Sequence, residues 1–157
     1  MARYFLDSSA VVKRYVGDEV GHDWVTNLCD PNVGHVLIIA EVTLAEVVTT
    51  FARMARQPPV RCTVAERDQF IALFRLDVQN NYLVLPLSHE ICDRAGDLAC
   101  THPLRAYDAI QLSSALSVRD EAIALGLDVP TFVCADANLL TIASSEGLAV
   151  ENPNQHP

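Results

Sequence analysis

The sequence predicts a three-layer α/β/α fold, in which a parallel β-sheet is covered by helices on both faces. Short apolar runs recur along the chain and alternate with longer segments whose apolar residues are spaced at helical intervals. Strands that alternate with helices in this way form parallel sheets. The chain has 157 residues, half of them hydrophobic, which is enough to bury a core. We expect a single domain over residues 1–151 and a frayed tail at 152–157.

Five short apolar segments are predicted as strands. They are uncharged and rich in β-branched, aromatic or leucine side chains, as in strands that are buried on both faces of a parallel sheet. Polar or turn-forming residues bound them, such as Pro86 after the third. The predicted strands are Tyr4–Leu6, Val36–Ile39, Tyr82–Leu85, Thr131–Ala135 and Leu148–Val150.

The segments between these strands carry helical periodicity and recognisable helix ends. Thr43 is in position to cap a helix over 44–56. Thr63 and Glu66 form a capping-box pattern that opens a helix over 64–78. The other helices are predicted after Asp7, before Leu28, after Ser88, from Arg105 to Leu116 with a break before a continuation to Leu125, and over 137–146.

Composition limits the class of protein. The formal net charge of −9 argues against a protein that holds nucleic acid on a broad basic surface, but not against one that acts on it through bound cations. The five cysteines are scattered, without a C-x-x-C pair, and are expected to be reduced. No stretch reaches the ~18 consecutive apolar residues of a membrane span. We therefore expect a cytoplasmic protein without a membrane partner.

Four acidic residues stand out because their neighbours are apolar or small. Asp7 and Asp136 end the first and fourth predicted strands, and Glu46 and Asp108 lie in early turns of predicted helices. In a parallel sheet these positions can converge on one edge, where ligands bind in α/β folds. Alternatively, two of the acids only cap helices and two lie on the surface. Three further acids fit exposed positions equally well and are weaker candidates: Glu41, Asp97 and Glu121.

A cluster of four carboxylates has chemical consequences. Like charges within a few ångström raise one another's pKa values, so the group must either accept protons or bind cations. Oxygen ligands without a Cys or His partner favour Mg²⁺ or Mn²⁺ over zinc. In phosphoryl-transfer nucleases such a site activates a water that attacks phosphorus and neutralises charge on the leaving oxygen. The pattern thus points to a phosphodiester hydrolase.

The segments that contain these acids resemble a known family. RYFLDSSAVVKRYV, VTLAEVVTTFARMAR, LRAYDAIQLSSAL and FVCADANLLTIASSEGL resemble the successive motifs of the PIN-domain ribonucleases, specifically the VapC-type toxins of toxin–antitoxin pairs. The resemblance runs from Tyr4 to Val150 in the family's order and spacing. It implies a PIN-like five-stranded parallel sheet of order 3-2-1-4-5 and a toxin that cleaves RNA endonucleolytically.

The resemblance also implies site residues and partners. The family's four acids fall on Asp7, Glu46, Asp108 and Asp136, which we expect to be both catalytic residues and ligands of Mg²⁺ or Mn²⁺. Members are typically homodimers that an antitoxin neutralises by reaching into the acidic groove. The implied partners are therefore an RNA substrate, a cognate antitoxin with a basic segment and a second copy of the chain.

Several residues around the acids are candidates for supporting roles. The small polar residue that the family has two positions after its first acid falls on Ser9, which is implied to orient a metal-bound water, while Ser8 is expected to cap the helix. Ser8, Arg14 and Asn138 are further candidates for supporting the metal ligands or contacting substrate. Cys134 stands where the family commonly has Ser or Thr, and a thiol is a poor hydrogen-bond partner for such a water.

A cluster of three arginines can be interpreted in two ways. Arg53, Arg56 and Arg61 surround the turn at Pro58–Pro59 and form either a phosphate-facing rim or a solvated surface.

Two other functions remain open for the chain. One is a catalytically weak protein whose acidic groove only binds a basic partner. The other is a DNA or structure-specific nuclease of the same fold, because the metal chemistry does not distinguish the sugars.

Overall fold

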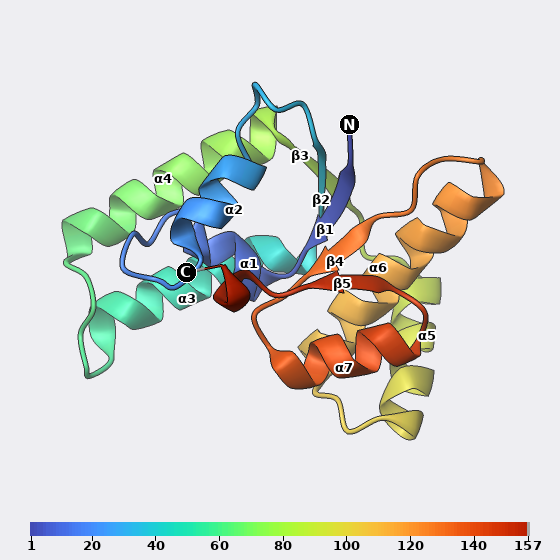
Figure 1. Cartoon of the computed structure of the whole chain (residues 1–157). Helices are drawn as coiled ribbons and strands as arrows, with labels where there is room; N and C mark the ends of the chain where they lie inside the picture. The colour runs from blue at the N-terminus through green and yellow to red at the C-terminus, as the bar shows by residue number, and fades with distance from the viewer. Residues whose placement is uncertain (157) are drawn as a thin grey trace.

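The computed structural model describes residues 1–156 and has a five-stranded sheet at its centre (Figure 1). The strands lie in the order β3-β2-β1-β4-β5, and all neighbouring pairs are parallel. The predicted fold class and strand order are therefore confirmed. The strands are β1 (Arg3–Leu6), β2 (Val36–Ala40), β3 (Tyr82–Leu85), β4 (Thr131–Val133) and β5 (Ala149–Glu151).

Helices cover both faces of the sheet. Figure 1 shows α1 to α4 on one side of it and α5 to α7 on the other. The helices are α1 (Ser8–Lys13), α2 (His22–Leu28), α3 (Val42–Arg56), α4 (Val64–Asn80), α5 (His89–Thr101), α6 (Ala106–Ala124), α7 (Ala137–Ser145) and the short 3₁₀ helix η1 (Pro153–Gln155).

Each face of the sheet has its own hydrophobic core. Leu6, Ile39 and Val133 point toward α1 to α4 and belong to one cluster of buried residues. Phe5 and Phe132 point the other way, toward α6 and α7, with their ring centroids 6.0 Å apart. Because both faces are buried, the strands read as continuous apolar runs, which is why they were visible in the sequence.

Two helices differ from the predictions. The predicted break after Leu116 is absent, and α6 runs unbroken from Ala106 to Ala124. Thr43 does not cap α3, because the helix begins two residues earlier than predicted, at Val42, with Glu41 in the N-cap position. Thr43 is instead fully buried, and its hydroxyl accepts a hydrogen bond from Gln111. The capping box that opens α4 is present as predicted.

The end of the chain is packed rather than frayed. Residues 153–155 form η1, with Pro153 buried. The His156 ring stacks on Trp24 with the centroids 4.5 Å apart. Gly21, at φ +82°, lies so close to η1 that a Cβ there would overlap the Pro153 carbonyl. The expected fraying is therefore wrong for residues 152–156, and Pro157 lies outside the described residues.

Neither a disulfide nor a helix long and apolar enough to cross a membrane occurs in residues 1–156. All five cysteines are free thiols, and three of them are buried. Within residues 1–156, the helices are all too short or too polar to cross a membrane.

Candidate active site

Asp7 lies at the carboxyl end of the central strand, where it also begins α1. Its carboxylate oxygen Oδ2 accepts hydrogen bonds from the backbone N–H of Ser9 at 3.1 Å and from the Ser9 hydroxyl at 2.6 Å. The residue in the N-cap position of α1 is therefore Asp7, and the expectation that Ser8 caps this helix is wrong. Only 5% of Asp7 is exposed, so a carboxylate is buried beneath the first turn of the helix.

Ser9 and Cys134 connect Asp7 to the neighbouring strand. The Ser9 hydroxyl accepts a hydrogen bond from the backbone N–H of Ala135 at 3.0 Å while donating to Asp7. The thiol of Cys134 donates to Asp7 Oδ2 at 3.5 Å. Burial raises the pKa of this thiol, which keeps it protonated as a donor. Both side chains thus fix the Asp7 carboxylate against the loop after β4.

Glu46 projects from the second turn of α3 and is held by a buried amide. Gln111 Nε2 donates to Glu46 Oε2 at 2.7 Å and to Thr43 Oγ1 at 2.9 Å. Gln111 is fully buried, and its Oε1 has no hydrogen-bond partner in residues 1–156. Gln111 was missed, although one signal in the sequence could have indicated it: it is a glutamine one helical turn after Asp108, in a segment of small and apolar residues.

The other two acids lie in the first turn of α6 and at the start of α7. Asp108 is partly buried. Asp136 is exposed and caps α7, since its Oδ1 accepts from the N–H groups of Asn138 at 2.8 Å and Leu139 at 3.2 Å. The alternative of helix capping is therefore correct for Asp7 and Asp136, but capping leaves room for a second role.

The pKa shifts of the acids show that they lie near one another. Burial raises the pKa of Asp7. Burial also raises the pKa of Glu46, and the charges of Asp7 and Asp108 raise it further, against the hydrogen bond from Gln111. For Asp108 burial is again the main cause of a raised pKa, followed by Asp7 and Asp136. Asp108 thus lies within electrostatic reach of the three other acids, and the four carboxylates form one group of like charges.

This group is not neutralised by a salt bridge, although the nearby charge of Arg105 opposes the rise in the pKa of Asp108. Among residues 1–156, none of the four acids forms a salt bridge, although many other acids do. In the same part of the chain, no three His, Cys, Asp or Glu side chains are arranged to hold an ion directly. The donors are nonetheless all oxygens, which fits Mg²⁺ or Mn²⁺, since Mg²⁺ usually keeps several waters between itself and protein ligands.

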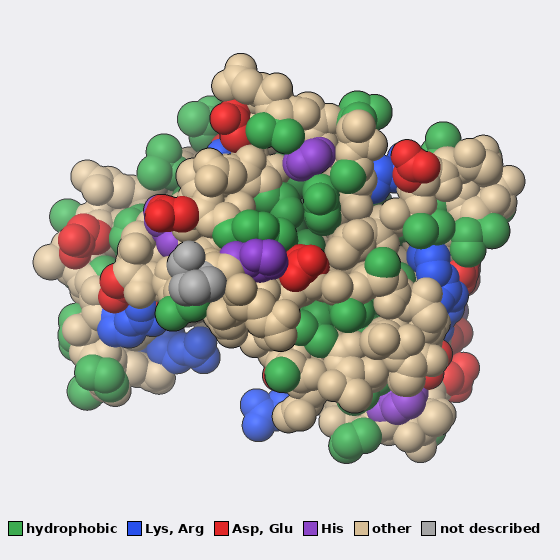
Figure 2. Space-filling model, in the orientation of Figure 1, with side chains coloured by type: hydrophobic (Ala, Val, Ile, Leu, Met, Phe, Trp, Pro, Cys, Tyr) green, Lys and Arg blue, Asp and Glu red, His purple; other side chains and the backbone are tan. Residues whose placement is uncertain are grey.

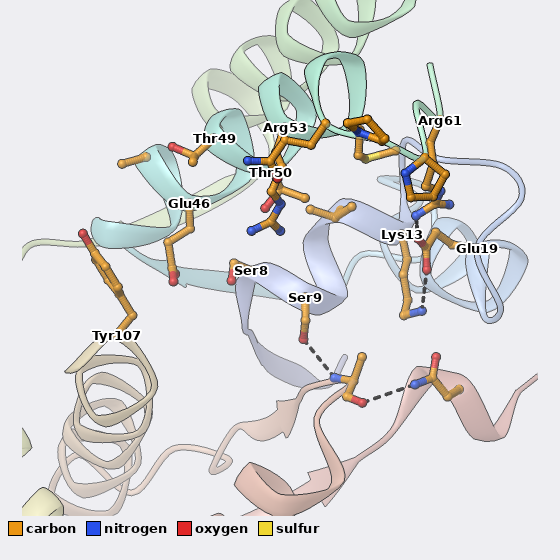
Figure 3. A pocket seen from close by; sticks show the side chains of 18 residues that line it. Ser8, Ser9, Lys13, Glu19, Glu46, Thr49, Thr50, Arg53, Arg61 and Tyr107 are labelled. Atoms are coloured by element: carbon orange, nitrogen blue, oxygen red, sulfur yellow. Dashed lines mark hydrogen bonds and ion pairs between the residues drawn. The ribbon is translucent and has the colours of Figure 1, made fainter. Parts of the chain in front are cut away.

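A cleft of about 860 Å³ opens beside the acids. In Figure 2 the molecule is hollowed along its lower edge, between α3 and α7, and Lys and Arg side chains border the hollow. Figure 3 shows Ser8, Ser9 and Glu46 on the wall of this cleft. Of the four acids only Glu46 lines it directly, since Asp7 lies beneath Ser8 and Ser9.

Two of the predicted supporting residues have other surroundings. Arg14 does not reach the cleft, because its guanidinium pairs with Asp77 at 2.7 Å. Asn138 is exposed in the first turn of α7 and contributes its backbone N–H to Asp136. Asn154 of η1 lines the cleft instead, and its Nδ2 donates to the Ala135 carbonyl at 3.2 Å. Nothing in the sequence distinguished Asn154 from the rest of a polar tail.

Comparisons with known proteins give a family and a set of similar structures. The family model of the PIN domain matches residues 4–130. The comparison with curated protein sequences gave no match. The VapC20 toxin of Mycobacterium tuberculosis, described as cleaving the sarcin–ricin loop, is 16% identical, with 98% of this chain and 99% of that chain covered and a TM-score of 0.61.

Two further solved structures contain similar chains. VapBC2 of Rickettsia felis, solved with a promoter DNA fragment, matches at 15% identity over 96% of this chain and 98% of that chain, with a TM-score of 0.60. FitAcB of Neisseria gonorrhoeae matches at 14% identity over 96% and 97%, with a TM-score of 0.62. At such identities the likeness is one of fold. Since the family model matches most of the chain, this protein belongs to the PIN-domain family and has the fold of VapC-type toxins.

Proposed function

We propose that this protein is the toxin of a toxin–antitoxin pair and acts as a metal-dependent endoribonuclease. The observation that carries the proposal is the group formed by Asp7, Glu46, Asp108 and Asp136. These carboxylates come from four separate segments, three of them have raised pKa values, and no basic side chain in residues 1–156 pairs with them. Perturbed acids gathered beside a cleft are typical of functional sites.

The four acids are proposed to hold Mg²⁺ or Mn²⁺. Such an ion lowers the pKa of a water and offsets negative charge at the phosphate that is attacked. The chain's own residues prepare the ligands: Ser9 and Cys134 orient Asp7 through its Oδ2, and Gln111 orients Glu46 through its Oε2. Neither carboxylate then has to give up a salt bridge when a cation arrives.

The proposed partners follow from the same charge distribution. The four acids form no salt bridge within residues 1–156, and the chain has a net charge of −9. Both features suit an antitoxin with a basic segment. Support comes from the similar structures, which include one described as a toxin–antitoxin complex from Klebsiella pneumoniae. RNA is favoured as substrate because VapC20, of the same fold, is described as an RNA-loop-cleaving toxin. A homodimer in the cytoplasm completes the proposal.

A cleavage assay tests this function. Purified protein is incubated with labelled structured RNAs, and with single- and double-stranded DNA, in Mg²⁺, in Mn²⁺ and in chelator. We expect cleavage of RNA with either metal and none with chelator. Asp7→Asn should abolish cleavage, whereas Asp23→Asn, which changes an exposed acid on α2 far from the group in sequence, should not.

Each alternative has its own outcome in this assay. Cleavage that survives both chelation and Asp7→Asn would overturn the proposed site. Cleavage restricted to DNA would favour a DNA nuclease of the same fold. Tight binding of a basic partner without cleavage of any nucleic acid would favour the catalytically weak binding protein.

A further inference from the structure

We propose that the cleft holds an unpaired, single-stranded stretch of RNA, with Arg53 binding a phosphate on one side of the acids and Tyr107 stacking a base on the other. The inference rests on the proposed function, because it concerns how the substrate of that site is held. It assigns residues that lie outside the four family acids.

One face of α3 forms the wall of the cleft. Four polar side chains of this helix line it, at relative positions i, i+3, i+4 and i+7: Glu46, Thr49, Thr50 and Arg53. This spacing places them on one side of a helix. At 1.5 Å per residue, Glu46 and Arg53 are about 10 Å apart along the helix axis. A ligand that reaches both must therefore be longer than a single phosphate group.

Arg53 is the basic side chain of this cleft that is available to an anion. Figure 3 shows it pointing from α3 into the cleft, toward the turn that carries Ser8 and Ser9. Lys13 and Arg61 also line the cleft, but both pair with Glu19, at 3.2 and 2.7 Å. Arg53 makes no salt bridge to any carboxylate of residues 1–156. A guanidinium in this position is suited to a phosphate.

Tyr107 lies on the other side of Glu46 from Arg53 (Figure 3). It directly precedes Asp108 in the first turn of α6 and is 56% exposed. In Figure 3 it extends from α6 toward α3, beside Glu46. An aromatic side chain that packs in no core and lies beside a polar cleft offers its face to a base, and such stacking needs no particular sequence.

The two residues together define the form of the substrate. Glu46 and Ser8 lie between Tyr107 and Arg53 in Figure 3, so a strand bound by both Tyr107 and Arg53 passes over Glu46. A base inside a duplex has both faces covered by its neighbours and cannot stack on Tyr107. The site therefore selects nucleotides that are unpaired, such as those of loops or single strands.

Binding measurements test the proposal independently of cleavage. The protein carries Asp7→Asn to prevent cleavage, and its affinity for a labelled ribo-oligonucleotide of about ten nucleotides, a length in the range that single-strand grooves bind, is followed by fluorescence anisotropy. The matched basic variants are Arg53→Gln and Arg56→Gln. Arg56 lies on the same helix, is exposed and does not line the cleft.

The two residues should give different signatures. Arg53→Gln should lower the slope of log affinity against log salt by about 0.7, the value for one phosphate contact on a single strand, and Arg56→Gln should leave it unchanged. Tyr107→Ala should weaken binding about 5- to 100-fold, whereas Tyr107→Phe keeps the ring and should bind normally. An abasic oligonucleotide should erase the effect of Tyr107→Ala but not that of Arg53→Gln.

Several results would overturn the proposal. These are equal salt slopes for the Arg53 and Arg56 variants, equal affinities for the Ala and Phe variants of Tyr107, a duplex that binds as tightly as the single strand, and no RNA binding at all. A protein that binds RNA in this way but never cleaves it would refute the proposed nuclease and leave this inference standing. If substitutions of Arg53 and Tyr107 left the rate of RNA cleavage unchanged, the proposed nuclease would stand and this inference would be refuted.

Discussion

Asp7, which is buried, and Asp77, which is partly buried, lie in opposite electrostatic environments. Asp77 on α4 accepts hydrogen bonds from Arg14 Nε, the Tyr15 hydroxyl and Asn81 Nδ2, each at 2.7 Å. Burial alone would raise its pKa, but these donors outweigh burial and hold the pKa below the ordinary value. Around Asp7 burial prevails and the pKa is raised, because its donors are a hydroxyl, a thiol and a backbone N–H.

The difference separates an acid that the fold itself neutralises from one that the fold leaves unbalanced. The cation that balances Asp77 belongs to the chain and is in place when the fold forms. The cation that would balance Asp7 has to come from outside. A protein tolerates such an unbalanced group at a cost in stability, which is why groups of this kind are found at functional sites. Substituting the two acids should therefore have opposite effects.

The largest expected effect is the loss of cleavage in Asp7→Asn. Removing a ligand of the proposed cation should lower kcat/KM by about 1,000-fold, equivalent to several kcal/mol. In chelator the same variant should have a higher melting temperature than the unsubstituted protein, because a buried charge disappears while Asn still caps α1. Thermal denaturation followed by circular dichroism measures this, and a lower melting temperature would contradict the comparison.

Asp77→Asn should do the reverse. It leaves the Arg14 guanidinium without its carboxylate and should lower the free energy of unfolding by about 3 kcal/mol, with kcat/KM of the folded protein unchanged. Urea denaturation measures the loss. Asp68→Asn is the matched control, since Asp68 lies on the same helix but its pair with Arg67 is exposed. A similar loss of unfolding free energy in both variants would refute the claim that the hydrogen-bonded pair of Arg14 and Asp77 stabilises the fold more than an exposed pair does.

The destabilisation of Asp77→Asn should depend on pH in a defined direction. The folded-state pKa of Asp77 is lowered, so its contribution to stability is fully present above the unfolded value of about 3.9. As pH falls below that value and through the folded-state pKa, the contribution is lost. The stabilities of the two proteins should therefore converge at acidic pH, and a difference that stays constant would exclude this linkage.

The smallest expected effect is that of Gln111→Leu. Without the amide, Glu46 loses its hydrogen bond, and kcat/KM should fall about 10- to 100-fold, with a higher Mn²⁺ concentration needed for half-maximal activity. Stability should change little, because the buried and unpartnered Oε1 is removed as well. Ser117→Ala on the same helix is the control. An unchanged Mn²⁺ requirement would refute a positioning role for Gln111.

The sequence was most informative where local chemistry decides the structure. The strand Tyr82–Leu85 and the box of Thr63 and Glu66 were predicted to the residue, because an apolar run ended by proline and a reciprocal cap need no distant partner. Thr43 was misassigned as a cap because its hydroxyl is used by Gln111 on another helix, 68 residues away. That contact is decided by packing between helices.

The same division holds for the site. The acids could be found from the sequence because a carboxylate among small and apolar residues is conspicuous. The partner of Arg14 could not be identified from the sequence, because Asp77 lies 63 positions away and only the fold brings the two side chains together. Asn154 was missed because the docking of η1 on α2, through residues such as Trp24, has no signature in the sequence.

The bonds between β1 and β4 bear on when activity can arise during synthesis. The Ser9 hydroxyl meets the Ala135 backbone across 126 positions, and the Asp7 backbone N–H donates to the Val133 carbonyl. A nascent chain that has not yet exposed β4 contains Asp7, Glu46 and Asp108, but it lacks Asp136 and the loop that fixes Asp7. A product that ends before β4 should accordingly lack the proposed cleavage activity, and this activity should begin only after β4 and the loop that follows it have packed against β1.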